Sequence, residues 1–203
     1  MHMHPRRTLL LLMLILFSAF NSQTGKPQIT KWVIMKGGSL KVDGSTNINK
    51  FNCVIANYAK PDTLSLYKYA NKEVLPISGS LKLDVQKFDC HHPIMTSDLR
   101  KTLKAKEFPT LTIRFINLNR YPDPDIKHDL VKGIVTIELA GVTRRLEVDY
   151  KFISGGENVI NLIGTRQVNF SDFKIIPPRK IGGMIQTNDE LTVVFNLRMK
   201  VID

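Results

Sequence analysis

The sequence is poor in residues that build metal or redox centres. It has two cysteines and five histidines in 203 residues. It contains no G-x-S-x-G elbow, no H-E-x-x-H pair, no G-x-x-x-x-G-K-[ST] phosphate loop and no dinucleotide-binding glycine run. These absences argue against the commonest hydrolase, zinc-protease and nucleotide-binding classes. We therefore predict no catalytic residue, no metal and no cofactor, and expect a binding protein rather than an enzyme.

A long apolar run is absent beyond the first residues. Arg6 and Arg7 precede an apolar run from Leu9 to Phe17, about half of the roughly 20 residues that span a bilayer. A basic start, a short apolar run and then small residues are typical of a cleaved export signal. We expect residues 1–22 to be a signal peptide, residues 23–203 to form one domain, and the product to be periplasmic or secreted.

Acidic residues are outnumbered, with 18 Asp and Glu against 29 Lys and Arg and a formal charge of +11. No recognition helix or RNA-binding aromatic motif accompanies this charge, so we expect no nucleic-acid partner. An anionic membrane surface or an acidic ligand head group suits a basic exported protein. The alternative is that the basic side chains only cover solvated strand faces and sheet edges. A homodimer is also compatible with this composition.

Apolar and polar residues alternate in most of the chain beyond residue 30, which is typical of half-buried antiparallel strands. The clearest runs are Leu81–Gln86, Leu111–Phe115, Arg145–Phe152 and Thr192–Val201. Further strands are expected at Trp32 to Val42, with Gly37 and Gly38 as a bulge, at Phe51 to Tyr58, at Val131 to Leu139 and near Val159 to Phe170. The pattern predicts an all-β domain of roughly eight strands.

Two short segments predict hairpin turns between neighbouring strands. They are Gly141-Val142-Thr143 and Ser154-Gly155-Gly156-Glu157-Asn158. Repeated hairpins leave unpaired sheet edges, which antiparallel proteins remove by closing a barrel or shield in a sandwich. A barrel of about eight strands can enclose one small ligand, so this choice bears on function.

One segment has a helical pattern, from Thr96 to Lys106. Met95, Leu99 and Leu103 recur four apart on one face, and Thr96 or Ser97 is placed to cap the amino end. We expect one short amphipathic helix lying on the β domain.

Cys53 and Cys90 are the only cysteines. In an oxidising compartment a disulfide is the simplest interpretation, and it would close a loop of about 38 residues worth about 4 kcal/mol in chain entropy. Two free buried thiols, or a metal site shared with His91 or His92, are the alternatives.

Histidines give the only basis for an enzymatic alternative. A secreted hydrolase or metal-dependent enzyme would use His91, His92 or His128 with a nearby carboxylate. His91 and His92 are adjacent, however, and on an extended backbone neighbours point to opposite faces. A structural β module with a filled core and no ligand is a further alternative.

Several fragments, in order along the chain, together resemble the YceI-like family of exported proteins. These are Trp32 with Gly44–Phe51, the stretch from Met95 to Phe115, Gly141–Arg144, Ser171–Ile175 and the closing segment Glu190 to Val201. Two segments depart from the family pattern, the loop from Asp123 to Asp129 and the stretch Arg179–Gly183.

The resemblance implies a lipocalin-like antiparallel barrel that binds a polyisoprenoid or another amphipathic, fatty-acid-like lipid, without enzymatic activity. It also supports the Cys53–Cys90 bridge, since some members carry a cysteine in each corresponding segment. Basic residues near an open end would meet an acidic head group. Inward positions expected to line the cavity are Leu81, Leu83, Ile113, Phe115, Ile137, Leu146, Val148 and Phe195.

Overall fold

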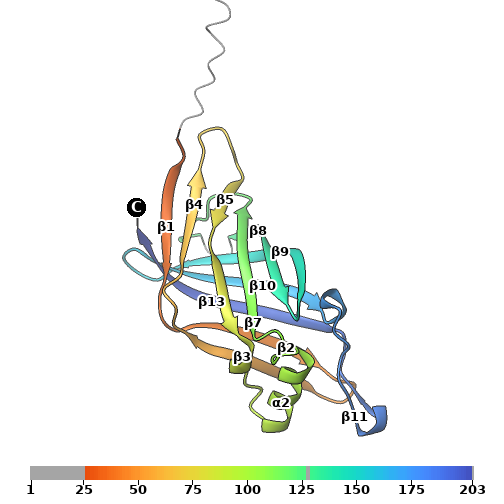
Figure 1. Ribbon diagram of the computed structural model, residues 1–203. Helices are drawn as coiled ribbons and strands as arrows, with labels where there is room; N and C mark the ends of the chain where they lie inside the picture. Colours follow the sequence, from red (N-terminus) through yellow and green to blue (C-terminus); the bar gives the residue numbers. More distant parts are fainter. Residues whose placement is uncertain (1–25, 127–128, 203) are drawn as a thin grey trace, which may run out of the picture.

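The chain folds into a closed antiparallel β-barrel with one α-helix (Figure 1), in a computed structural model that describes residues 26–126 and 129–202. The expected signal peptide and His128 lie outside the described residues. The elements are β1 (Gln28–Ile34), β2 (Gly38–Ser45), β3 (Lys50–Tyr58), β4 (Thr63–Lys68), β5 (Leu75–Ser78), β6 (Ser80–Asp84), α2 (Pro93–Thr102), β7 (Thr110–Leu118), β8 (Leu130–Leu139), β9 (Val142–Ser154), β10 (Val159–Asn169), β11 (Arg179–Lys180), β12 (Ile185–Gln186) and β13 (Glu190–Ile202), with 3₁₀ turns η1 (Val85–Lys87), η2 (Ser171–Phe173) and η3 (Ile181–Gly183).

Three of the long strands are each broken into two halves. β1 and β2 both pair with β13, and the break between them falls at residues 35–37. β3 pairs with β2 and β4 pairs with β1, with a break at residues 59–62. β5 and β6 both pair with β7 and are separated by Gly79. Counted as long strands, the barrel has the roughly eight that the alternation predicts.

β13 closes the barrel. It pairs with β10 over eleven positions, from Val159 opposite Lys200 to Asn169 opposite Glu190. Its other edge pairs with β1 at Met199 and beyond, and with β2 between Thr192 and Asn196. The last strand of the chain is therefore joined to the first in a continuous ring, which removes the open sheet edges.

Alternation places one face of the barrel strands in the barrel interior, whereas β11 and β12 form a separate exposed hairpin. On β9 the buried residues are Val148, Tyr150 and Phe152, with exposed or half-buried residues between them. Gly164 makes room for one large ring, because a Cβ at this position would lie 2.2 Å from Cζ of Phe195.

The barrel opens out at one end, here called the flared end. At this end β3 separates from β6, and β9 separates from β10. β3 and β6 form no strand pair, and their gap is spanned by a single bridge between Val54 and Asp89. β9 and β10 pair only as far as Asp149 opposite Thr165. Helix α2 lies at this end, close to the β2–β3 hairpin (Figure 1). At the opposite end β4 and β5 pair and keep the ring closed.

The structure confirms the antiparallel barrel and both hairpin turns. The bulge expected at Gly37 and Gly38 is a full interruption of the strand at residues 35–37, followed by a register shift between Gly38 and Leu40. The expected helix boundaries are wrong: α2 starts at Pro93 and ends at Thr102, with His92 as its N-cap. Proline suits the first helical position because it has no N–H that would remain unpaired. Thr96 is not a cap; its hydroxyl accepts a hydrogen bond from the Cys90 N–H at 2.9 Å. β4 and β5 were not predicted.

Candidate ligand site

Aromatic side chains fill the middle of the barrel. Trp32 and Phe152 have ring centroids 5.5 Å apart, and Tyr150 lies 5.9 Å from Phe195, which in turn lies 6.1 Å from Phe115. Edge-to-face and tilted contacts of this kind add about 0.5–1.5 kcal/mol per pair beyond the burial of area. The middle of the barrel is therefore packed, and open space lies elsewhere.

An apolar cavity of about 70 Å³, called the inner hollow, lies between the aromatic cluster and the elements that cover the flared end. Leu99 and Leu103 close it from the α2 side, and Phe170 and Phe173 close it from the η2 side. Asn169 is the one polar residue in its lining. The full lining is Leu40, Val42, Phe88, Leu99, Leu103, Leu111, Ile113, Ile137, Leu139, Val168, Asn169, Phe170, Phe173, Ile175, Leu191 and Val193.

A second cavity of about 260 Å³, called the outer hollow, opens at the surface of the flared end. It lies between the β2–β3 turn, the start of α2 and the β11–β12 hairpin, with Ile48, Ile94 and Ile185 in its lining. Leu99 and Phe170 line both hollows. These two side chains are all that the linings have in common, so they form the partition between the surface and the interior.

The expected cavity residues fall into two groups. Ile113 and Ile137 line the inner hollow. The other six lie outside that lining. Leu146 is half-buried. The remaining five are buried in the packed core: Leu81, Leu83, Phe115, Val148 and Phe195. Their contact with a ligand stays a prediction.

Most residues that line the inner hollow were not predicted from the sequence, because most of them lie outside the clearest alternating runs. Val168 lies near the end of β10, Phe170 follows that strand directly, and Val42 lies in β2, the second half of the first long strand. The apolar face of the helix was the available signal, since Leu99 and Leu103 stand on it and both face the hollow.

Two buried polar atoms in the barrel have no hydrogen-bond partner among the described residues, the Trp32 indole nitrogen and the Tyr150 hydroxyl oxygen. Both side chains are almost completely buried. Burial raises the pKa of Tyr150 well above its ordinary value, because the phenolate would lose its hydration. The hydroxyl therefore stays neutral and is a donor and acceptor inside an otherwise apolar interior.

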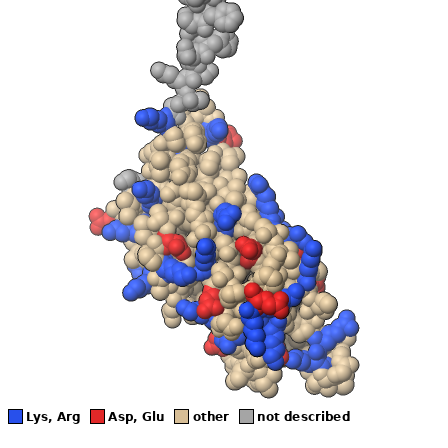
Figure 2. All heavy atoms as spheres, in the orientation of Figure 1, with Lys and Arg blue, Asp and Glu red and all other residues tan. Residues whose placement is uncertain are grey.

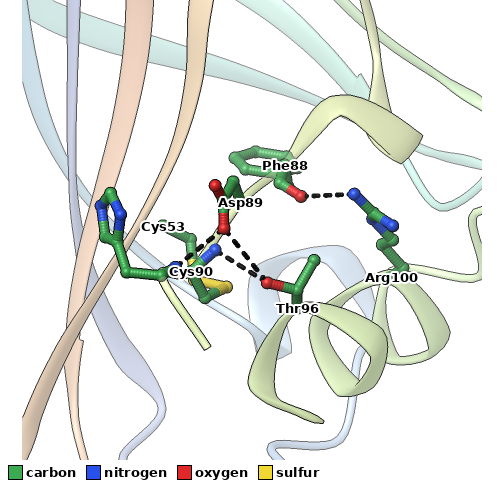
Figure 3. Close-up of a disulfide and its surroundings, with 7 residues drawn as sticks. Cys53, Phe88, Asp89, Cys90, Thr96 and Arg100 are labelled. Atoms are coloured by element: carbon green, nitrogen blue, oxygen red, sulfur yellow. Dashed lines mark hydrogen bonds between the residues drawn. A yellow bond between two sulfur atoms is a disulfide. The ribbon is translucent and has the colours of Figure 1, made fainter. Parts of the chain in front are cut away.

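A disulfide joins Cys53 of β3 to Cys90, across the gap between β3 and β6 (Figure 3). It confirms the predicted bridge, and the alternatives of free thiols or a cysteine-bound metal are wrong. Beside it, Val54 and Asp89 exchange two backbone hydrogen bonds of 2.8 and 2.9 Å. Covalent and hydrogen bonds together therefore close this seam.

The same segment holds helix α2 in place over the hollow. Arg100 donates from its guanidinium to the Phe88 carbonyl at 2.9 Å, and the Thr96 hydroxyl receives the Cys90 N–H (Figure 3). Hydrogen bonds that involve a charged group contribute about 1.5–3 kcal/mol each. The segment from Phe88 to Cys90 thus closes the barrel seam through the disulfide and holds the helix that carries Leu99 through hydrogen bonds.

Of the three histidines in the enzymatic alternative, the structure describes His91 and His92. His91 and His92 are exposed, and the backbone N–H of His91 donates to the Asp89 carboxylate at 2.8 Å. Within residues 26–126 and 129–202, no group of three His, Cys, Asp or Glu side chains is arranged to hold a metal ion. The same ranges contain no helix with the length and apolarity needed to cross a bilayer.

A closed antiparallel barrel with an apolar hollow beneath one helix defines the chain as a β-barrel domain with an internal cavity. The chain belongs to the YceI-like domain family, whose model matches residues 24–199. The sequence has no significant match among curated proteins.

Two solved structures share the fold. BcnA of Burkholderia cenocepacia has 14% sequence identity and a TM-score of 0.59, with 82% of this chain and 96% of that chain covered. A polyisoprenoid-binding domain of Saccharophagus degradans, implicated in plant cell wall breakdown, has 12% identity and a TM-score of 0.56, with 86% of this chain and all of that chain covered. Each likeness covers more than four fifths of this chain.

Proposed function

We propose that this protein is an exported carrier that holds a polyisoprenoid or a similar amphipathic lipid in its barrel, without catalysing a reaction. The observation that carries the proposal is that an apolar hollow inside the barrel and a hollow at the surface adjoin, separated by the side chains of Leu99 and Phe170. The polyisoprenoid-binding domain that shares the fold supports this class of ligand.

The sizes of the hollows indicate how a chain-like ligand is accommodated. The inner hollow has about 70 Å³ and the outer one about 260 Å³, and together they reach the lower end of the roughly 300–1,000 Å³ of small-molecule sites. A long hydrocarbon therefore needs Leu99 and Phe170 to move apart. Each buried methylene then contributes about 0.8 kcal/mol to the binding free energy. A longer hydrocarbon chain therefore binds more tightly, and no catalytic group is needed.

Adjacent residues on β13 allow a matched test. Val193 lines the inner hollow, whereas Val194 points to the other face of the strand and pairs with Lys41 and Thr165. Val193→Phe fills the hollow and Val194→Phe adds the same bulk outside it. We expect Val193→Phe to weaken binding of a polyprenol by about tenfold or more, as loss of two buried methylenes would, and Val194→Phe to leave it unchanged.

The measurement is native mass spectrometry of protein expressed with its full leader, followed by organic extraction and then titration with a polyprenol in mild detergent. Bound lipid in the wild type and its loss in Val193→Phe support a carrier. Equal binding by both variants, or a wild type that takes up no lipid, would overturn it. Cell fractionation and the intact mass of the mature chain test export separately.

A further inference from the structure

We propose that the flared end docks on a bilayer that contains anionic lipid, with the apolar side chains around the outer hollow inserted among the lipid head groups. The inference rests on the proposed carrier function, and it names the surface from which the lipid enters and leaves.

Four exposed apolar side chains, here called the apolar rim, stand on three separate protrusions around the outer hollow. Ile48 is 66% exposed on the β2–β3 turn, and Ile94 is 66% exposed at the start of α2. Ile181 and Met184 are 66% and 72% exposed on the β11–β12 hairpin. Ile48 and Ile94 line the outer hollow, and Ile181 and Met184 stand on the hairpin that borders it. Single exposed apolar residues are common, so the significance of these four lies in their position together at the mouth of one hollow.

The protrusions are held to one another, so the rim is a defined surface. The Asn47 side chain donates to the Met184 carbonyl at 2.9 Å and accepts from the Gln186 N–H at 3.0 Å, which ties the β2–β3 turn to the hairpin. An ion pair of 2.6 Å between Lys180 and Asp98 ties the hairpin to α2. The three protrusions therefore meet a flat bilayer together.

Ile181 is exposed at a backbone position that disfavours it. Its φ is 51°, and the following Gly182 and Gly183 have φ of 61° and 94°. A β-branched residue in the left-handed region is strained, whereas glycine adopts it freely. An apolar, strained and exposed side chain lowers the stability of the isolated molecule, so it indicates a contact made with something else.

Basic residues flank the rim. Lys101, Lys104 and Lys106 are exposed on and just after α2, and Lys50 and Arg179 are exposed beside the rim residues. Figure 2 shows uncharged surface at the tips of the flared end with Lys and Arg side chains next to it. Insertion of apolar side chains combined with attraction of basic ones to anionic head groups is the usual mode of interfacial binding.

The path behind the rim favours a bilayer over a protein partner. Only Leu99 and Phe170 separate the outer hollow from the apolar interior, so under the proposed function whatever covers the outer hollow must supply an apolar chain to it. A bilayer provides such chains. The rim also consists of separate side chains on protruding tips rather than the continuous packed core of a protein interface.

The first experiment measures sedimentation of the full protein with vesicles of phosphatidylcholine, alone or with phosphatidylglycerol. The variant is Ile181→Gly with Met184→Ser, in which the glycine relieves the backbone strain, so weaker binding cannot be attributed to unfolding. We expect vesicle binding to fall by about tenfold while the melting temperature is unchanged or rises. Leu130→Ser is the matched control, since Leu130 is 62% exposed at the opposite end.

The second experiment tests the charges. Lys101→Glu with Lys104→Glu should remove the preference for phosphatidylglycerol, and added salt should weaken wild-type binding. Lys68→Glu with Lys72→Glu, in and just after β4 near the opposite end, makes the same charge change away from the rim and should have little effect.

The proposal is overturned if the wild type does not sediment with either kind of vesicle, or if Leu130→Ser weakens binding as much as the rim variant. It is also overturned if the rim variant binds like the wild type. Failure of docking with normal polyprenol binding in detergent removes the docking surface alone, whereas loss of both removes the carrier function as well.

Discussion

Lys180 and Asp98 form an ion pair of 2.6 Å that joins the β11–β12 hairpin to helix α2 across the outer hollow. The pair links a segment that departs from the family pattern to the helix that carries Leu99. Both partners are partly exposed, with 47% and 22% of their side chains accessible. Its contribution to global stability is therefore small, and we expect its main effect to be on how easily the hairpin separates from α2.

Asp98→Asn tests this relationship. We expect the free energy of unfolding to fall by less than about 1 kcal/mol, as for other exposed pairs, while amide exchange in residues 179–186 and polyprenol uptake both become faster. Hydrogen exchange and stopped-flow uptake measure the two effects. The charge-reversed double variant, Asp98→Lys with Lys180→Asp, should restore slow exchange. Unchanged exchange in the single variant would show that the pair does not hold the hairpin.

The disulfide gives a larger effect on stability. Cys53→Ala with Cys90→Ala removes a cross-link between residues 37 apart in sequence, for which the chain-entropy relation gives about 4 kcal/mol. We expect a loss of about 2–4 kcal/mol in urea denaturation, with the earliest exchange in α2 and β3. Reduction of the wild type is the matched control and should give the same loss. A loss of well under 1 kcal/mol would mean that the seam is closed by hydrogen bonds alone.

Gly164 is predicted to be intolerant of any side chain. A Cβ at this position would lie 2.2 Å from the Phe195 ring, which is held in turn by Phe115 and Tyr150. Gly164→Ala should cost about 1–3 kcal/mol through overpacking, measured by thermal and urea unfolding. Thr165→Ala, the exposed neighbour, is the control. Adding Phe195→Leu should recover part of the loss, and if it does not, the clash is not the cause.

Tyr58 and Tyr150 make the stability of the fold depend on pH in the alkaline range. Burial raises the pKa of both, and the Tyr58 hydroxyl also donates to the Asp62 carboxylate. The ordinary tyrosine pKa is near 10. Below this pH the folded and unfolded states both retain the two hydroxyl protons, so stability is unaffected. Above it the unfolded chain loses protons that the folded barrel retains, so stability falls as pH rises.

We therefore expect two of the five tyrosines to ionise only as the barrel unfolds, which a spectrophotometric titration at 295 nm detects. In Tyr150→Phe about half of this late absorbance change should vanish. The same variant should be as stable as the wild type, or up to about 1–3 kcal/mol more stable, because it removes a buried hydroxyl without a partner. Early ionisation of both tyrosines would contradict the burial.

The barrel itself was predictable from alternation, because a strand with one buried face must place apolar residues at every second position. The strand from Trp32 was expected to bulge at Gly37 and Gly38; it is interrupted at residues 35–37, and its pairing with β3 shifts register between Gly38 and Leu40. β4 and β5 escaped prediction because they are short, with buried residues at Leu64, Leu66, Leu75 and Ile77. Short strands carry too few alternations to stand out from loops.

The site was less predictable than the fold. Alternation identifies which residues point inward, but it does not distinguish an inward residue that packs against a ring from one that faces a hollow. Phe115 and Phe195 meet across the interior and fill it, whereas Ile113, two residues away, faces open space. That difference depends on the volumes of side chains from distant strands, which no local pattern records.

β13 has a consequence for the order in which the molecule forms. Glu190–Ile202 supplies the partner for β10 and for both halves of the first long strand, so neither end of the ring closes without it. A chain delivered from its amino end, by a ribosome or through a membrane channel, therefore remains an open sheet until the final residues arrive. Closure is then set by pairing of the most distant segments, the slow kind of folding step, and truncation of this one strand abolishes the barrel as a whole.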